Sequence, residues 1–93
     1  MGLAMVRVTT FLTGRVQGVG MRFAVHDLAR HYPIVGFVQN LDDGRVQIVT
    51  EGEDHQIESF LARLRDVAPG AIHECSSYQS TASGEFARFE IRR

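Results

Sequence analysis

The chain has 93 residues, which suffice for one hydrophobic core but not for two, so we expect a single domain over residues 1–93. Hydrophobic residues make up 44% and charged residues 23%, proportions that are typical of globular proteins and exclude a disordered or fibrous chain. The formal net charge is -1, which excludes a broad positive surface for nucleic acids or anionic membranes, so any bound anion must be held by local groups.

The N-terminal third of the chain predicts a strand followed by a helix. Residues 5–13 are rich in β-branched and aromatic side chains, and their apolar residues alternate as in a strand. From Met21 onward the apolar residues recur at the spacing of one helical face. We expect this helix to end by Tyr32, because Pro33 disfavours the α conformation in the residue before it. The apolar face contains Met21, Ala24, Val25, Leu28 and Ala29.

A β-hairpin is predicted in the middle of the chain. Residues 34–40 (IVGFVQN) and residues 45–50 (RVQIVT) both have the composition of strands. Between them the sequence LDDG contains Asp43-Gly44, a dipeptide that favours the tight turns of hairpins. These two strands are therefore expected to pair with each other and to run antiparallel.

The rest of the chain predicts a second helix and two further extended segments. Apolar residues at helical spacing span residues 57–67, and the acidic residues 53–54 before them suit the positive end of a helix dipole. Residues 69–70 (PG) end this helix. Residues 71–78 and 86–92 are predicted to be extended, on either side of a turn in STASGE. The second apolar face contains Ile57, Phe60, Leu61, Leu64 and Val67.

The predicted order is strand, helix, strand, strand, helix, strand, with one additional late strand. Each helix has one apolar face, which must be buried against the apolar face of a sheet. An antiparallel sheet that is covered on one side by both helices meets this need. The sequence therefore predicts an α+β fold, a ferredoxin-like βαββαβ sandwich.

The segment GRVQGVGMRF, residues 14–23, connects the first predicted strand to the first predicted helix. Its glycines permit positive φ angles, and backbone N–H groups freed from strand pairing join those at the start of the helix. Together these donors form a site that suits phosphate. Arg22 lies in the first turn of the helix, off its apolar face, where its guanidinium can make bidentate contact with phosphate oxygens. The glycines are Gly14, Gly18 and Gly20.

Several groups that phosphate-handling enzymes use are missing from this segment. The Walker A pattern and its magnesium-binding hydroxyl do not occur, which argues against a nucleoside triphosphate. The one cysteine, Cys75, is far from the loop in sequence, so no thiol nucleophile is available there. Water must then attack the phosphorus, and a neutral amide can orient it without repelling the anion. Asn40 is the candidate, because the first and second strands of this fold run in the same direction and end at the same edge of the sheet.

Two segments of the chain resemble the signatures of the acylphosphatase family. They are GRVQGVGMR at residues 14–22 and GFVQNLDDGRVQIVTEG at residues 36–52, in the order and at the spacing of the family. The resemblance implies a small metal-free enzyme that hydrolyses acyl phosphates to a carboxylate and inorganic phosphate. It assigns the binding of phosphate to Arg22 and the positioning of the attacking water to Asn40. The other substrate-binding residues that it implies are Arg15, Val16, Gln17, Gly18, Val19 and Gly20.

Less specific interpretations of the same residues remain open. Glycines between a strand and a helix often serve only as turn residues, an arginine at a helix start is usually solvated, and Asn40 before LDDG could be a turn residue. The alternative function is a non-catalytic domain that binds phosphate or carbamoyl phosphate, since acylphosphatase-like domains also occur inside larger maturation proteins. An RNA-binding module is disfavoured, because FARFEIR lacks the glycine-aromatic motif and the net charge is negative.

The composition gives further expectations about partners and location. A single cysteine excludes an intrachain disulfide and a multi-thiolate metal site, and it fits a reducing compartment. The histidines lack the spacing of metal ligands. No signal peptide and no apolar run of about 18 residues occurs. From these features we expect a cytoplasmic protein that contacts neither nucleic acid nor membrane. The resemblance to acylphosphatases adds the expectation of a monomer that uses no metal or cofactor and binds a small acyl phosphate.

Overall fold

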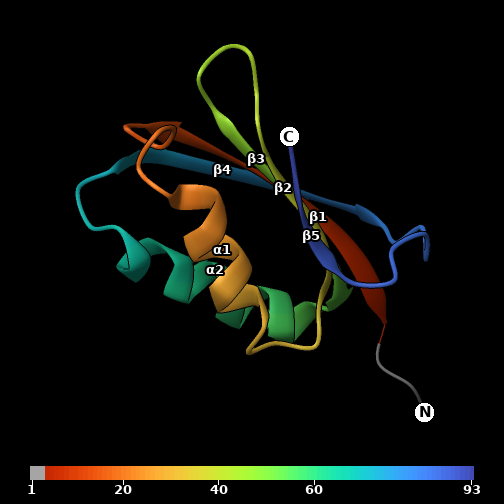
Figure 1. The fold of residues 1–93 in the computed structure, drawn as a ribbon. Coiled ribbons are helices and arrows are strands. Elements are labelled where there is room, and N and C mark those ends of the chain that lie inside the picture. Colours follow the sequence, from red (N-terminus) through yellow and green to blue (C-terminus); the bar gives the residue numbers. More distant parts are fainter. Residues whose placement is uncertain (1–3) are drawn as a thin grey trace.

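The computed structural model describes residues 4–93, which form a five-stranded sheet and two helices (Figure 1). Residues 1–3 of the predicted domain lie outside the described residues. Every predicted strand and helix is present. In chain order the elements are β1 (Met5–Gly14), α1 (Met21–Ala29), β2 (Val35–Asn40), β3 (Val46–Glu53), α2 (Asp54–Val67), β4 (Ile72–Thr81) and β5 (Phe89–Arg92).

The strands lie in the order β4-β1-β3-β2-β5. β1 pairs antiparallel with both β4 and β3, and β3 pairs antiparallel with β2. β5 pairs parallel with β2, so the sheet is mixed, whereas the sequence predicts an antiparallel one. The reason is that β4 and β5 lie at opposite edges of the sheet. The chain between them crosses the sheet, and β5 then runs parallel to β2. Both helices cover the same face in Figure 1, and the predicted ferredoxin-like α+β fold is confirmed.

The hydrophobic core lies between the sheet and the two helices. Each helix buries three residues of its predicted apolar face against fully buried residues of the central strands. The Phe60 ring contacts the Tyr32 and Phe89 rings edge-on, with centroids 5.9 and 6.1 Å away. Val67 differs from the prediction, because it lies in the last turn of α2 and is 37% exposed. The buried helical residues are Met21, Val25, Ala29, Ile57, Phe60 and Leu64.

The helices begin and end close to the predicted positions. α1 starts at Met21 and ends at Ala29, before the predicted limit at Tyr32. The Glu53 carboxylate caps α2, because its Oε1 accepts a hydrogen bond from the backbone N–H of His55 (3.2 Å). Within residues 4–93, neither helix combines the length and the apolarity that crossing a bilayer requires.

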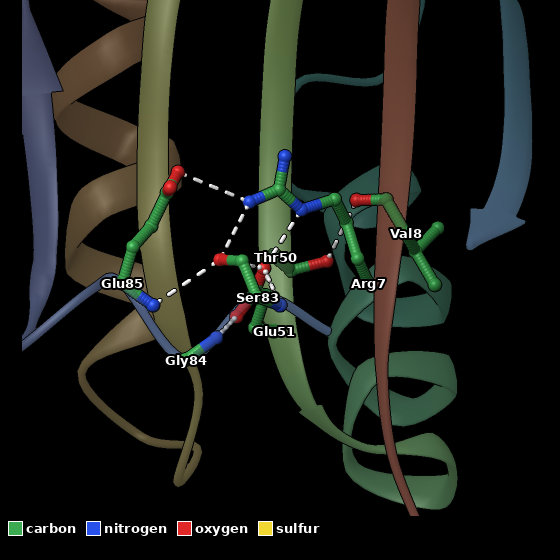
Figure 2. A network of polar contacts seen from close by, with 7 residues as sticks. All are labelled: Arg7, Val8, Thr50, Glu51, Ser83, Gly84 and Glu85. Carbon is green, nitrogen blue, oxygen red and sulfur yellow. Dashed lines mark hydrogen bonds and ion pairs between the residues drawn. The ribbon is translucent and has the colours of Figure 1, made fainter. Parts of the chain in front are cut away.

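A buried carboxylate holds the segment between β4 and β5 on the face of the sheet opposite the helices (Figure 2). Glu51 of β3 is 2% exposed. Its oxygens accept hydrogen bonds from the backbone N–H groups of Ser83 and Gly84, both at 2.9 Å, and from the Ser83 hydroxyl at 2.8 Å. Arg7, which lies opposite Glu51 on β1, forms an ion pair with the same carboxylate (Nε to Oε2, 2.7 Å). One side chain of a central strand therefore anchors the crossing segment.

The pKa of Glu51 is lowered from 4.5 to about 2. Burial raises this pKa, but hydrogen bonds from the backbone N–H groups of Ser83 and Gly84, together with Arg7, lower it by more. A folded-state pKa below the unfolded-state value means that ionised Glu51 stabilises the fold above about pH 4.5, and that this stabilisation is lost as the pH falls toward 2. Because one pKa unit corresponds to about 1.4 kcal/mol, the contribution at neutral pH is about 3 kcal/mol.

We expect Glu51→Gln to lower the free energy of unfolding by about 3 kcal/mol at pH 7, and by less than half as much at pH 3, where wild type has already lost much of this stabilisation. Urea denaturation of both proteins at the two pH values measures the difference. Glu85→Gln is the matched control, because Glu85 pairs with Arg7 but is 59% exposed, and its loss is expected to cost less than about 1 kcal/mol. An equal cost of Glu51→Gln at both pH values would contradict the role of its charge.

Candidate phosphate site

The ends of β1 and β2 lie at the same edge of the sheet. Leu12 of β1 and Asn40 of β2 both pair with Val46 of β3, so β1 and β2 run in the same direction on either side of β3. Adjacent strands are about 4.8 Å apart, which puts the backbones of Leu12 and Asn40 roughly 10 Å from each other. The strand directions on which the choice of Asn40 depends are therefore confirmed, and residues 15–20 follow β1 at this edge.

The loop enters α1 through two glycines in the left-handed conformation. Gly18 has φ 77° and Gly20 has φ 78°, a region that other residues rarely adopt, and open space surrounds the position of an added Cβ at both. The backbone conformation, not the packing, therefore favours glycine. Gly20 is the N-cap of α1 and no side chain of residues 4–93 caps the first turn, so the N–H groups of that turn are left for another acceptor.

A cavity of about 110 Å³ lies between this loop, the start of α1 and the end of β2. One water molecule needs roughly 10–15 Å³, so the cavity leaves room for a small anion. Buried Met21 forms part of the wall. Within residues 4–93, no three side chains of His, Cys, Asp or Glu gather into a group that could hold a metal ion. The predicted site residues that line the cavity are Val16, Gly18, Gly20, Arg22 and Asn40.

The two predicted catalytic residues line the cavity from different elements. Arg22 of α1 is half-buried, and its Nη1 donates a hydrogen bond to the backbone carbonyl of Arg92 in β5 (3.2 Å). No carboxylate among residues 4–93 forms an ion pair with Arg22, so its charge is available to an anion. Asn40 is half-buried, and its Oδ1 atom is buried without a hydrogen-bond partner in the described chain. Leaving such an acceptor unpaired costs about 1–3 kcal/mol, which favours binding of a donor there.

Three predicted substrate-binding residues do not line the cavity. Arg15 has an exposed side chain, and its backbone N–H donates a hydrogen bond to the carbonyl of Ala71 (2.8 Å), so this N–H is not free for an anion. The Gln17 side chain is hydrogen-bonded to the β2–β3 hairpin instead. Val19, between the two glycines of the loop, is 56% exposed.

Two features of the site are missing from the sequence prediction. Phe23 follows Arg22, lines the cavity and is 57% exposed. A signal for it is present in the sequence, because Phe23 is a large apolar residue outside the predicted apolar face of its helix. The contact of Arg22 with the Arg92 carbonyl has no such signal, since a backbone acceptor depends on where β5 lies and not on the residue type.

Comparison with known proteins identifies the family. A family model described as acylphosphatase matches residues 8–91. The chain belongs to the acylphosphatase family. An acylphosphatase from Methanospirillum hungatei is 43% identical over 90 residues, which cover 96% of this chain and 99% of that protein. The prediction of an acylphosphatase enzyme is thereby confirmed at the level of the family.

Solved structures with a similar fold include a chain of about the same length and a much longer chain. The crystal structure of acylphosphatase from Bacillus subtilis matches with a TM-score of 0.87 and 32% identity, and the match covers 95% of this chain and 99% of that one. Full-length HypF, in its phosphate- and nucleotide-bound form, matches with a TM-score of 0.86 and 26% identity. That match covers 100% of this chain but 12% of HypF, so the same fold also occurs within a much longer chain.

Proposed function

We propose that this acylphosphatase hydrolyses the carboxyl-phosphate bond of acyl phosphates by direct attack of a water molecule that Asn40 orients. The Arg22 guanidinium and backbone N–H groups of residues 16–20 and of the first turn of α1 hold the phosphoryl group. The observation that carries the proposal is the Asn40 Oδ1 atom, a buried acceptor without a partner among residues 4–93, on a residue that lines the same cavity as Arg22. An attacking water needs such an acceptor, because one of its hydrogens must be held while an oxygen lone pair points at phosphorus.

In the proposed reaction, the water oxygen bonds to phosphorus while the bond between phosphorus and the bridging oxygen breaks. The electron pair of the broken bond leaves on the carboxylate, and the protons of the water stay with the phosphate, which exchanges them with solvent. A carboxylate leaves readily because its pKa is about 4, so no strong general acid is required. Positioning and charge stabilisation then supply the catalysis, as they do in phosphoryl transfer generally.

We also propose that the chain acts as a monomeric single domain over residues 1–93, in the cytoplasm and without a metal or cofactor. Cys75, a half-buried residue of β4 and the one cysteine of the chain, supports a reducing compartment. Phe23, which lines the cavity and is more than half exposed, supports a small substrate whose acyl group is apolar. Size-exclusion chromatography at assay concentration checks the monomer.

A non-catalytic domain that binds phosphate or carbamoyl phosphate is the second candidate. The likeness to part of HypF, whose structure is in a phosphate- and nucleotide-bound form, favours this function. Such a domain needs the groups that hold the anion, but it does not need an acceptor for the hydrogen of an attacking water. The buried Oδ1 atom of Asn40 therefore favours the enzyme.

Hydrolysis of benzoyl phosphate, followed with and without a chelator, separates the two candidates. We expect turnover that the chelator does not change and that inorganic phosphate inhibits competitively, because the product occupies the same donors as the phosphoryl group. Binding of inorganic phosphate in calorimetry without any turnover would assign the protein to the binding function instead.

A further inference from the structure

The Gln17 side chain connects the proposed phosphate loop to the hairpin that follows Asn40. Its Nε2 donates one hydrogen bond to the carbonyl of Leu41 (2.8 Å) and another to the carbonyl of Arg45 (2.9 Å). The Leu41 N–H donates to the same Arg45 carbonyl (2.8 Å), which closes the base of the turn. One side-chain amide therefore joins the loop to both sides of the hairpin at the base of its turn.

We infer that Gln17 is a positioning residue for Asn40. This inference rests on the proposed function, in which Asn40 orients the attacking water. The Leu41 carbonyl belongs to the residue directly after Asn40, so the hydrogen bond to it restrains the backbone from which the Asn40 side chain projects. Among residues 4–93, no other side-chain hydrogen bond joins residues 15–20 to residues 41–45.

Asn40 depends on this restraint because its Oδ1 atom accepts no hydrogen bond from the described part of the chain, residues 4–93. Within that part, the backbone and the packing of Asn40 set where this oxygen lies. The proposed anion is held by the loop and the proposed water by β2, which are separate segments. A displacement of about 1 Å between two such groups is enough to lower a rate by about 10². The Gln17 side-chain amide is the polar contact that fixes the position of the loop relative to the end of β2.

The role of the Gln17 side chain is distinct from the binding of the anion. A side-chain amide has two N–H donors, and both of those of Gln17 are used on the hairpin. The backbone N–H of Gln17 does not depend on the side chain and stays in the loop when the side chain is replaced. Loss of the side-chain amide is therefore expected to change the turnover number but not the affinity for phosphate.

Gln17→Met keeps the length of the side chain and removes both donors. We expect its kcat for benzoyl phosphate to fall about tenfold or more, while KM and the inhibition constant of inorganic phosphate change less than about twofold. Gln47→Met is the matched control. Gln47 accepts a hydrogen bond from Gln39 (2.7 Å), and because it follows buried Val46 in β3 its side chain points to the opposite face of the sheet, so its loss is expected to leave kcat unchanged.

A second measurement reads the position of Asn40 without any turnover. Asn40 is the only asparagine of the chain, so selective 15N-asparagine labelling gives one side-chain amide signal, a pair of peaks from the two hydrogens of a single nitrogen, in NMR spectra. We expect Gln17→Met to shift or broaden this signal and Gln47→Met to leave it in place. A role of Gln17 in overall stability alone would lower the melting temperature and leave both kcat and this signal of the folded protein unchanged.

Three results would overturn the inference and leave the proposed function intact. They are an unchanged kcat, a fall in kcat without any change in the Asn40 signal, and a rise in the phosphate inhibition constant at least as large as the fall in kcat. The last of these would assign Gln17 to the anion itself. Failure of the proposed function is recognised separately, by the absence of turnover in wild type, and the Asn40 signal then decides alone whether Gln17 positions this side chain.

Discussion

Arg22→Ala is expected to lower kcat/KM for benzoyl phosphate by at least about 10² to 10³, or about 2.7–4 kcal/mol of transition-state stabilisation. Arg22 is the one charged residue that lines the cavity, and no carboxylate of residues 4–93 neutralises it. Its guanidinium is proposed to hold the dianion in the ground state as well, so the inhibition constant of inorganic phosphate is expected to rise. Initial rates over a range of substrate and phosphate concentrations measure both effects.

Two further variants test whether the loss of activity depends on the shape of the charged group and on its position in the chain. Arg22→Lys keeps the charge but loses the planar fork, so we expect a smaller loss than for Arg22→Ala. Arg30→Ala removes the same charge from the end of α1, where Arg30 is 72% exposed, and wild-type kinetics are expected. Both alanine variants are expected to stay folded: exposed Arg30 contributes about 0.5 kcal/mol or less, and Arg22 loses one hydrogen bond, to the Arg92 carbonyl, at a cost of about 0.5–1.5 kcal/mol. Equal kinetics of Arg22→Ala and Arg30→Ala would remove Arg22 from the mechanism.

The fold could be predicted from the sequence wherever a local pattern decides it. Apolar residues at helical spacing gave both helices, and the Asp43-Gly44 dipeptide gave the hairpin between β2 and β3. The direction of β5 could not be predicted, because it depends on how residues 82–88 cross the sheet. Glu51 holds this crossing segment through the backbone N–H groups of Ser83 and Gly84, and neither periodicity nor composition signals such a contact.

The candidate site was predictable to the extent that it follows from strand directions. Arg22 and Asn40 line one cavity because β1 and β2 end at the same edge, which the predicted fold already implies. The individual roles within the loop were not predictable. The backbone N–H of Arg15 is taken by Ala71, and the Gln17 side chain by the hairpin, because segments distant in sequence supply these acceptors.

These contacts indicate different roles for different residues of the loop. Gly18 and Gly20 turn the backbone into α1 and leave its first N–H groups free of side-chain caps. Gln17 faces the hairpin, so it links the part that would hold the anion to the part that would hold the water. In the proposed mechanism, one short loop therefore supplies both the binding of the anion and the alignment of the water.

Asn40→Ala is expected to lower kcat by about 10² or more and to leave the inhibition constant of inorganic phosphate near the wild-type value. The amide is proposed to orient the water, not to hold the anion, so its loss affects the reacting geometry and not the bound phosphate. Gln39→Ala is the control, because successive side chains of a strand point to opposite faces, and wild-type kinetics are expected for it. Normal turnover of Asn40→Ala would exclude Asn40 from the reaction.

Stability gives the same variant a second expectation. The Oδ1 atom of Asn40 accepts no hydrogen bond from residues 4–93, so its removal breaks no hydrogen bond of this atom within the described chain. Asn40→Ala is therefore expected to unfold in urea with a free energy close to that of wild type, although it is nearly inactive. Asn40→Asp separates the two effects, since its negative charge repels the dianion and raises the phosphate inhibition constant. A marked loss of stability in Asn40→Ala would mean that the asparagine is a structural residue of the turn, because a group kept for catalysis is expected to cost stability and not to supply it.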